Sequence, residues 1–114
     1  YTLAADRTNA NVVNLYSPMQ PALLRFIRQI AEAGRQAGRT VAVCGEMASD
    51  ARLAPVLVGL GVTELSMTPT ALPTVRDALR QRSPEELAAL AEKISHLKTV
   101  AEVEEALEDF LRLT

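Results

Sequence analysis

The single cysteine of the chain lies in the stretch whose residue types are best suited to chemistry, Val43-Cys44-Gly45-Glu46. A cysteine that ends a short apolar run and precedes a glycine occupies the edge where parallel sheets present ligand-binding groups. Gly45 permits a sharp turn at this point because it has no Cβ. A thiol placed there serves as a nucleophile when a base deprotonates it, or as a proton donor when it stays neutral. The residue types alone also leave open a small buried core residue, since free cysteines are among the most buried side chains.

Other side chains with catalytic potential are less specific in their placement. His96, the one histidine, lies far along the chain in a polar helix end, so we expect a surface residue and no Cys–His nucleophilic pair. One cysteine and one histidine cannot supply a multi-thiolate zinc site, and we expect no metal ligands in the chain. Asp6 is interpreted as a local polar contact and Asp50 as a helix cap. Glu46, beside the cysteine, is a candidate for orienting an arginine or backbone groups.

Composition and charge narrow the class of protein. The 114 residues include 12 basic and 14 acidic side chains, a net charge of −2, with 48% hydrophobic and 23% charged residues. These values are typical of one soluble globular domain and disfavour binding to nucleic acid or to an anionic membrane. No apolar run approaches about 18 residues and no signal-peptide pattern opens the chain, so we expect a cytoplasmic protein without membrane insertion. The missing initiator methionine favours a fragment or a processed chain.

Helical and extended patterns alternate around the cysteine. Apolar residues recur with a helical period from about Pro21, and Gly38 is suited to end this helix in a left-handed conformation. The run 40–44 is short, rich in β-branched residues and apolar on both faces, which predicts a buried parallel strand. The helix face that we expect to be buried consists of Leu23, Leu24, Ile27, Ile30 and Ala31.

A second strand is predicted at 64–67, after a helix at about 51–60 that Ser49 or Asp50 caps and Gly61 ends. Because a helix connects the two strands, they form a β-α-β unit and run parallel. Two strands leave an unpaired edge on each side and are too few for an independent sheet. The predicted fold class is therefore α/β, and a piece of a larger α/β barrel explains the pattern better than a complete domain.

The remainder is predicted to be helical. A helix at 71–82 has Pro73 in its first turn, and two capping boxes follow, at 83–86 and 99–102. The second box precedes an apolar stripe of Val103, Leu107, Phe110 and Leu111.

Four segments, in this order and spacing, resemble phosphoenolpyruvate-utilising enzymes, above all the phosphoenolpyruvate–protein phosphotransferases (Enzyme I of the sugar phosphotransferase system). The run Tyr1-Thr-Leu-Ala-Ala-Asp-Arg7 resembles the one that directly follows the family's Gly-Thr-Asn-Asp magnesium and phosphate motif. Cys44-Gly-Glu-Met-Ala-Ser-Asp50 resembles the segment that carries the family's active-site cysteine. Segments 14–18 and 64–67 match as well, so the resemblance covers essentially the whole chain.

The resemblance implies a fold and two site residues. Residues 1–114 would be the C-terminal portion of the family's phosphoenolpyruvate-binding (β/α)8 TIM barrel, containing its last two strands and their helices. Cys44 would be the proton donor and Arg7 a substrate-binding arginine, whereas the ligands of the Mg²⁺ cofactor would lie upstream of Tyr1. Elementary chemistry agrees with both roles. A cysteine thiol has an ordinary pKa of about 8.5, so it is mostly protonated near pH 7 and can donate a proton. Arginine offers a rigid fork of hydrogen-bond donors that suits phosphate or carboxylate.

The resemblance also implies an activity and partners. The parent enzyme would transfer the phosphoryl group of phosphoenolpyruvate to a His of its own N-terminal domain and then to a phosphocarrier protein, releasing pyruvate. It would be a homodimer, and the chain alone would be inactive but prone to self-association through its strand edge. Two alternatives stay open: a pyruvate phosphate dikinase or phosphoenolpyruvate synthase fragment, and a non-catalytic α/β binding module with Cys44 buried and Arg7 pointing away from it.

Overall fold

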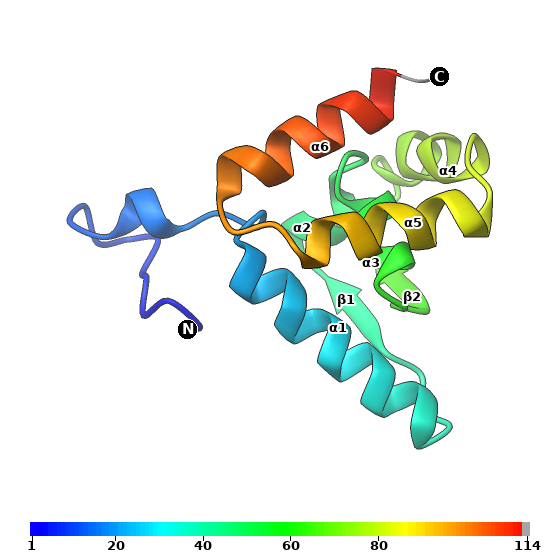
Figure 1. The fold of residues 1–114 in the computed structure, drawn as a ribbon, viewed down its shortest axis with the longest axis horizontal. Coiled ribbons are helices and arrows are strands. Elements are labelled where there is room, and N and C mark those ends of the chain that lie inside the picture. The colour runs from blue at the N-terminus through cyan, green and yellow to red at the C-terminus, as the bar shows by residue number, and fades with distance from the viewer. Residues whose placement is uncertain (113–114) are drawn as a thin grey trace.

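The computed structural model describes residues 1–112. Figure 1 shows helices stacked against a small sheet, with the N-terminal segment projecting to one side of them. The elements, in chain order, are η1 (Val13–Leu15), α1 (Pro21–Gln36), β1 (Ala42–Cys44), α2 (Glu46–Ser49), α3 (Ala54–Gly59), β2 (Glu64–Ser66), α4 (Leu72–Arg80), α5 (Pro84–Ser95) and α6 (Val100–Arg112).

The two strands run parallel, which confirms the predicted β-α-β unit, and their register pairs Ala42 with Glu64 and Cys44 with Ser66. The prediction of a strand buried on both faces is wrong. Only Val43 on β1 is half-buried against the core, while Ala42 and Cys44 are exposed. The reason is that helices cover one face of this sheet and, within residues 1–112, nothing covers the other. The predicted self-association through an unpaired strand edge stays a prediction.

The core lies between α3 and α5, the two helices in closest contact. Gly59 on α3 approaches α5 so closely that an added Cβ would lie 2.1 Å from the carbonyl oxygen of Leu87. The fully buried side chains include Leu24, Leu53, Leu57, Ile94, Val56 and Val103. The helix α1 therefore reaches the core through Leu24, and α6 reaches it through Val103.

One member of the predicted buried face of α1 is misplaced. Leu24, Ile27 and Ala31 are buried, but Ile30 is 44% exposed. Successive residues turn by about 100°, which places Ile30 roughly a quarter turn from the centre of the buried stripe. Gly38 follows α1 with a φ of 61°, as predicted for its left-handed cap.

The single helix predicted at 51–60 is divided in two. Helix α2 begins earlier, directly after Gly45, and ends at Ser49, and α3 begins only at Ala54. Asp50 separates them, because its carboxylate accepts a hydrogen bond from the Arg52 amide at 2.8 Å and closes a turn instead of capping a helix. Ser49 does not cap a following helix either, since its hydroxyl donates to the Gly45 carbonyl at 3.1 Å.

The predicted helix starts in the C-terminal part are confirmed. The Ser83 hydroxyl accepts from the Glu86 amide at 3.2 Å, and the Glu86 carboxylate accepts from the Ser83 amide at 2.7 Å. Thr99 and Glu102 repeat this reciprocal arrangement at 3.2 and 3.0 Å. Both helices are thereby fixed at their N-termini by local contacts, and α5 in turn packs against α3, which contacts α2 beside the sheet.

Candidate functional site

Cys44 is the last residue of β1, and its free thiol is exposed at the carboxyl end of the sheet. Gly45 follows with a φ of 80°, a left-handed conformation that strongly favours glycine and turns the chain from β1 into α2. The interpretation of Cys44 as a buried core residue is therefore wrong. The non-catalytic alternative that required a buried cysteine loses its support with it.

Arg7 and Cys44 line the same cleft, which has a volume of about 480 Å³. Arg7 comes from the irregular N-terminal segment and Cys44 from the sheet, so the fold brings together two residues that are distant in sequence. Within residues 1–112, no hydrogen bond or ion pair engages the Arg7 guanidinium, which leaves its donors available to a ligand. The other residues that line the cleft are Tyr16, Pro18, Gly45, Glu46, Met47, Asp50 and Leu53.

A local turn presents Arg7 to the cleft. The Asp6 carboxylate accepts hydrogen bonds from the Thr8 amide at 2.9 Å and from the Thr8 hydroxyl at 2.8 Å. These two bonds hold the pKa of Asp6 below its usual value. The Asn9 amide donates to the Asp6 carbonyl at 3.1 Å and completes the turn. Asp6 is thus the local polar contact that was predicted, and it shapes the backbone on both sides of Arg7.

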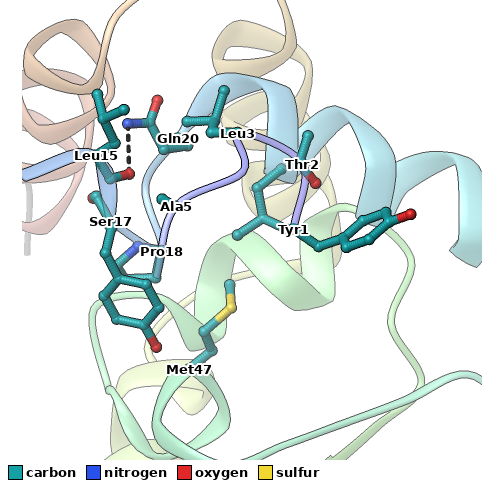
Figure 2. Close-up of a pocket in the computed structure, with 11 residues that line it drawn as sticks. Tyr1, Thr2, Leu3, Ala5, Leu15, Ser17, Pro18, Gln20 and Met47 are labelled. Carbon is teal, nitrogen blue, oxygen red and sulfur yellow. Dashed lines mark hydrogen bonds between the residues drawn. The ribbon is translucent and has the colours of Figure 1, made fainter. Parts of the chain in front are cut away.

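A second, smaller hollow adjoins the cleft on the side of the N-terminal segment (Figure 2), and it has a volume of about 130 Å³. Figure 2 shows the Met47 side chain pointing toward this segment. The Gln20 amide donates to the Leu15 carbonyl at 3.2 Å and holds the loop that forms the opposite wall. Tyr16, Pro18 and Met47 line both spaces and form the partition between them. Met47 packs against the core and also borders the cleft.

A third hollow, of about 490 Å³, lies on the other side of Cys44 and extends toward β2. It contains three hydroxyl side chains, those of Ser49, Ser66 and Thr68. Reasoning from the sequence did not single out Ser66. The predicted parallel β-α-β unit could have placed Ser66 on the strand next to Cys44. The register of the two strands, which pairs these residues, comes from the structure.

Two further residues were considered from the sequence, Glu46 and His96, and only Glu46 lies at the cleft. Glu46 borders the cleft, but within the described chain it forms no ion pair with an arginine, so its orienting role stays a prediction. His96 is exposed on the surface, as expected, and lies 3.0 Å from the Glu92 carboxylate at the end of α5. Among residues 1–112 there is no group of three or more His, Cys, Asp or Glu side chains that could hold a metal ion. No helix in this part of the chain is long and apolar enough to cross a membrane.

Comparison with known proteins defines the class to which this fold and site belong. Residues 1–84 match the family model of the PEP-binding domain of PEP-utilising enzymes, where PEP is phosphoenolpyruvate, and the chain belongs to this family. The predicted resemblance is thereby confirmed.

Several relatives that match nearly the whole chain are phosphoryl transfer proteins. The chain is 40% identical over 113 residues to the phosphoenolpyruvate-protein phosphotransferase of Latilactobacillus sakei, covering 98% of this chain and 20% of that protein. It is 43% identical over 103 residues to the enzyme of the same name from Bacillus subtilis (strain 168), covering 90% and 18%. A multiphosphoryl transfer protein of Escherichia coli O6:H1 is 39% identical over 110 residues, covering 96% and 13%. The chain thus spans about a fifth or less of the length of these relatives, and it is homologous to the C-terminal part of Enzyme I.

Proposed function

We propose that residues 1–114 form the C-terminal part of a (β/α)8 phosphoenolpyruvate-binding barrel in a phosphoenolpyruvate–protein phosphotransferase. Residues 113 and 114 lie outside the described residues. The family membership and the names of the relatives support this assignment. The sheet has two parallel strands, with helices on one face and an uncovered opposite face. Two adjacent strands of a (β/α)8 barrel have this arrangement, because their uncovered face is directed toward the barrel interior.

The observation that carries the proposal is the shared cleft of Arg7 and Cys44. When the phosphoryl group leaves phosphoenolpyruvate, the P–O bond breaks and the enolate of pyruvate remains. Arg7 binds the anionic substrate through its planar guanidinium, which matches phosphate and carboxylate groups. Cys44 gives its Sγ proton to C3 of the enolate. The C2–C3 π electrons form the new C–H bond, the C2 oxygen becomes a ketone, and the S–H electrons stay on sulfur as a thiolate.

The chain's own residues do not fit a magnesium site. The carboxylates that line the cleft within residues 1–112 are those of Glu46 and Asp50, and Asp50 is already engaged by the Arg52 guanidinium at 3.0 Å. We therefore assign no step to a metal bound by this chain, and the Mg²⁺ ligands implied by the resemblance belong to the sequence upstream of Tyr1. The transfer to a His of the parent protein, the phosphocarrier partner, the homodimer and the inactivity of the chain alone are parts of the same proposal.

Hydrogen exchange at C3 of pyruvate in D₂O tests the role of Cys44 directly. In the full-length protein that carries this chain, we expect Cys44→Ala to slow the exchange about 100-fold or more, because general acid–base groups typically contribute factors of 10² to 10⁴. Arg7→Lys keeps the charge but loses the bidentate geometry, and we expect it to raise the KM for phosphoenolpyruvate. Ser49→Ala, in the neighbouring hollow, is the matched control and should exchange at the normal rate. Exchange at the normal rate in Cys44→Ala contradicts the proposal.

A further inference from the structure

Ser66 lies directly beside Cys44 on the uncovered face of the sheet. The two residues are register partners on adjacent parallel strands, which lie about 4.8 Å apart. The side chains before them, Val43 and Leu65, pack against the helical core. Because successive side chains on a strand alternate between faces, the Cys44 thiol and the Ser66 hydroxyl both project to the opposite, exposed face.

The Ser66 hydroxyl is also the unengaged one in the hollow that Cys44 lines. Of the three hydroxyl groups there, that of Ser49 donates to the Gly45 carbonyl at 3.1 Å. The hydroxyl of Thr68 lies within hydrogen-bonding distance of the Thr70 hydroxyl, at 3.1 Å. Within the described residues, the Ser66 hydroxyl has no side-chain hydrogen bond, and it belongs to a short side chain with one rotatable bond. It is therefore free to turn toward a neighbouring acceptor.

We propose that Ser66 is a positioning residue for Cys44, and that its hydroxyl donates a hydrogen bond to the thiolate that remains after proton delivery. This inference rests on the proposed function, in which Cys44 protonates the enolate. A thiolate formed in the cleft needs a donor, because hydrogen bonds to a charged form stabilise that form. The thiolate then takes a proton from solvent and the thiol is restored. In this role Ser66 stabilises the thiolate product without touching the substrate.

The charged groups around the thiol do not explain the same effect. Glu46 on α2 and Glu64, two residues before Ser66 on the same face of β2, are carboxylates and disfavour a thiolate. Asp50 lies in the cleft but pairs with Arg52. Among residues 1–112, Arg7 is the cation that lines the cleft, and it does not line the hollow that extends toward β2. A substitution at Ser66 leaves all four groups in place, so any change in thiolate formation reports on the hydroxyl.

The alkylation rate of Cys44 by iodoacetamide, followed by mass spectrometry as a function of pH, tests the inference in the chain itself. Cys44 is the only cysteine, so each alkylation event is assigned without ambiguity. In Ser66→Ala we expect the midpoint of the rate profile to rise by about 0.5 to 1 pH unit, which corresponds to the loss of one hydrogen bond of ordinary net strength, about 0.7 to 1.4 kcal/mol. Ser66→Thr keeps a hydroxyl and should restore the midpoint, and Ser49→Ala should leave it unchanged.

An unchanged midpoint in Ser66→Ala overturns the inference, as does an equal rise in Ser49→Ala. Circular dichroism verifies that both variants fold, and Ser66→Thr provides a second folded variant for the comparison. The outcome is separate from that of the proposed function, because alkylation requires neither phosphoenolpyruvate nor the rest of the parent protein. If the midpoint shifts while Cys44→Ala retains pyruvate exchange, the proposed influence of Ser66 on Cys44 stands and the proposed catalytic role of Cys44 does not.

Discussion

Replacing Gly59 by alanine probes the close contact between α3 and α5 at the centre of the core. An alanine Cβ at this position would lie 2.1 Å from the Leu87 carbonyl oxygen, 2.8 Å from the Leu87 carbonyl carbon and 3.0 Å from the Ala91 Cβ. Carbon–oxygen contacts are normally no shorter than about 3.3 Å, so the two helices would have to separate locally by roughly 1 Å. The obstacle is backbone, which cannot rotate away as a side chain does.

The magnitude follows from two opposing effects. Alanine is favoured over glycine inside a helix by about 1 kcal/mol, which stabilises the variant. Overpacking of a tight core contact typically costs about 1 to 3 kcal/mol. We expect a cost at or above the upper end of this range at Gly59, because the obstacle is the Leu87 backbone and the buried side chains around it would have to separate. We therefore expect Gly59→Ala to lower the free energy of unfolding by about 2 kcal/mol or more.

Urea unfolding followed by far-UV circular dichroism measures this loss. Gly38→Ala is the control for steric crowding, because Gly38 has open space around its Cβ position; it lies beyond the end of α1 and has a φ of +61°. The left-handed conformation costs a non-glycine residue about 1 kcal/mol, part of which is recovered by the lower entropy of the unfolded chain. We expect the loss in Gly59→Ala to exceed that in Gly38→Ala. A Gly59→Ala variant as stable as the parent chain would refute the close-packing interpretation.

Two further predictions concern local contacts on the helices. Ser83→Ala removes the capping-box acceptor of α5, and we expect the free energy of unfolding to fall by about 1 kcal/mol in the same urea assay, whereas Ser95→Ala, at the other end of α5, should cost less. The Arg35 and Gln36 side chains hydrogen-bond Glu32 and lower its pKa from 4.5 to about 2. A lowered pKa in the folded state stabilises the fold above pH 4.5, and this contribution is lost as the pH falls toward 2. The parent chain should therefore be more stable than Glu32→Gln near neutral pH and at low salt, by a small amount because the pair is exposed. In acid titrations this difference in stability should shrink as the pH falls toward 2. A difference that grows on acidification contradicts the prediction.

Features that depend on neighbouring residues were predictable from the sequence, and features that depend on tertiary context were not. The capping box at Ser83 and the left-handed cap at Gly38 involve contacts within a few residues, and both were predicted correctly. The turn at Asp50 was missed, because an aspartate closes a turn or caps a helix with the same carboxylate geometry. The exposure of Ile30 depends on which arc of α1 meets the core, which the helical period leaves uncertain at the margins of the stripe.

The candidate site divides in the same way. The position of Cys44 at the end of a strand, before Gly45, followed from the local pattern. Its exposure did not, because an apolar run does not reveal whether both faces of a sheet are covered. The meeting of Arg7 with Cys44 in one cleft came from the family resemblance and not from spacing, since an irregular segment carries no periodicity that would place it.

The two halves of the cleft are attached to the molecule by different means. Cys44 is held by the sheet and by the helices packed beneath it, whereas Arg7 is held by the self-contained turn that the Asp6 carboxylate closes. The hydrogen bonds that close the turn join Asp6 to Thr8 and Asn9, none of which belongs to the sheet. Under the proposed function, a substitution in the turn therefore alters how Arg7 is presented to the substrate, and a substitution in the sheet alters how Cys44 is presented.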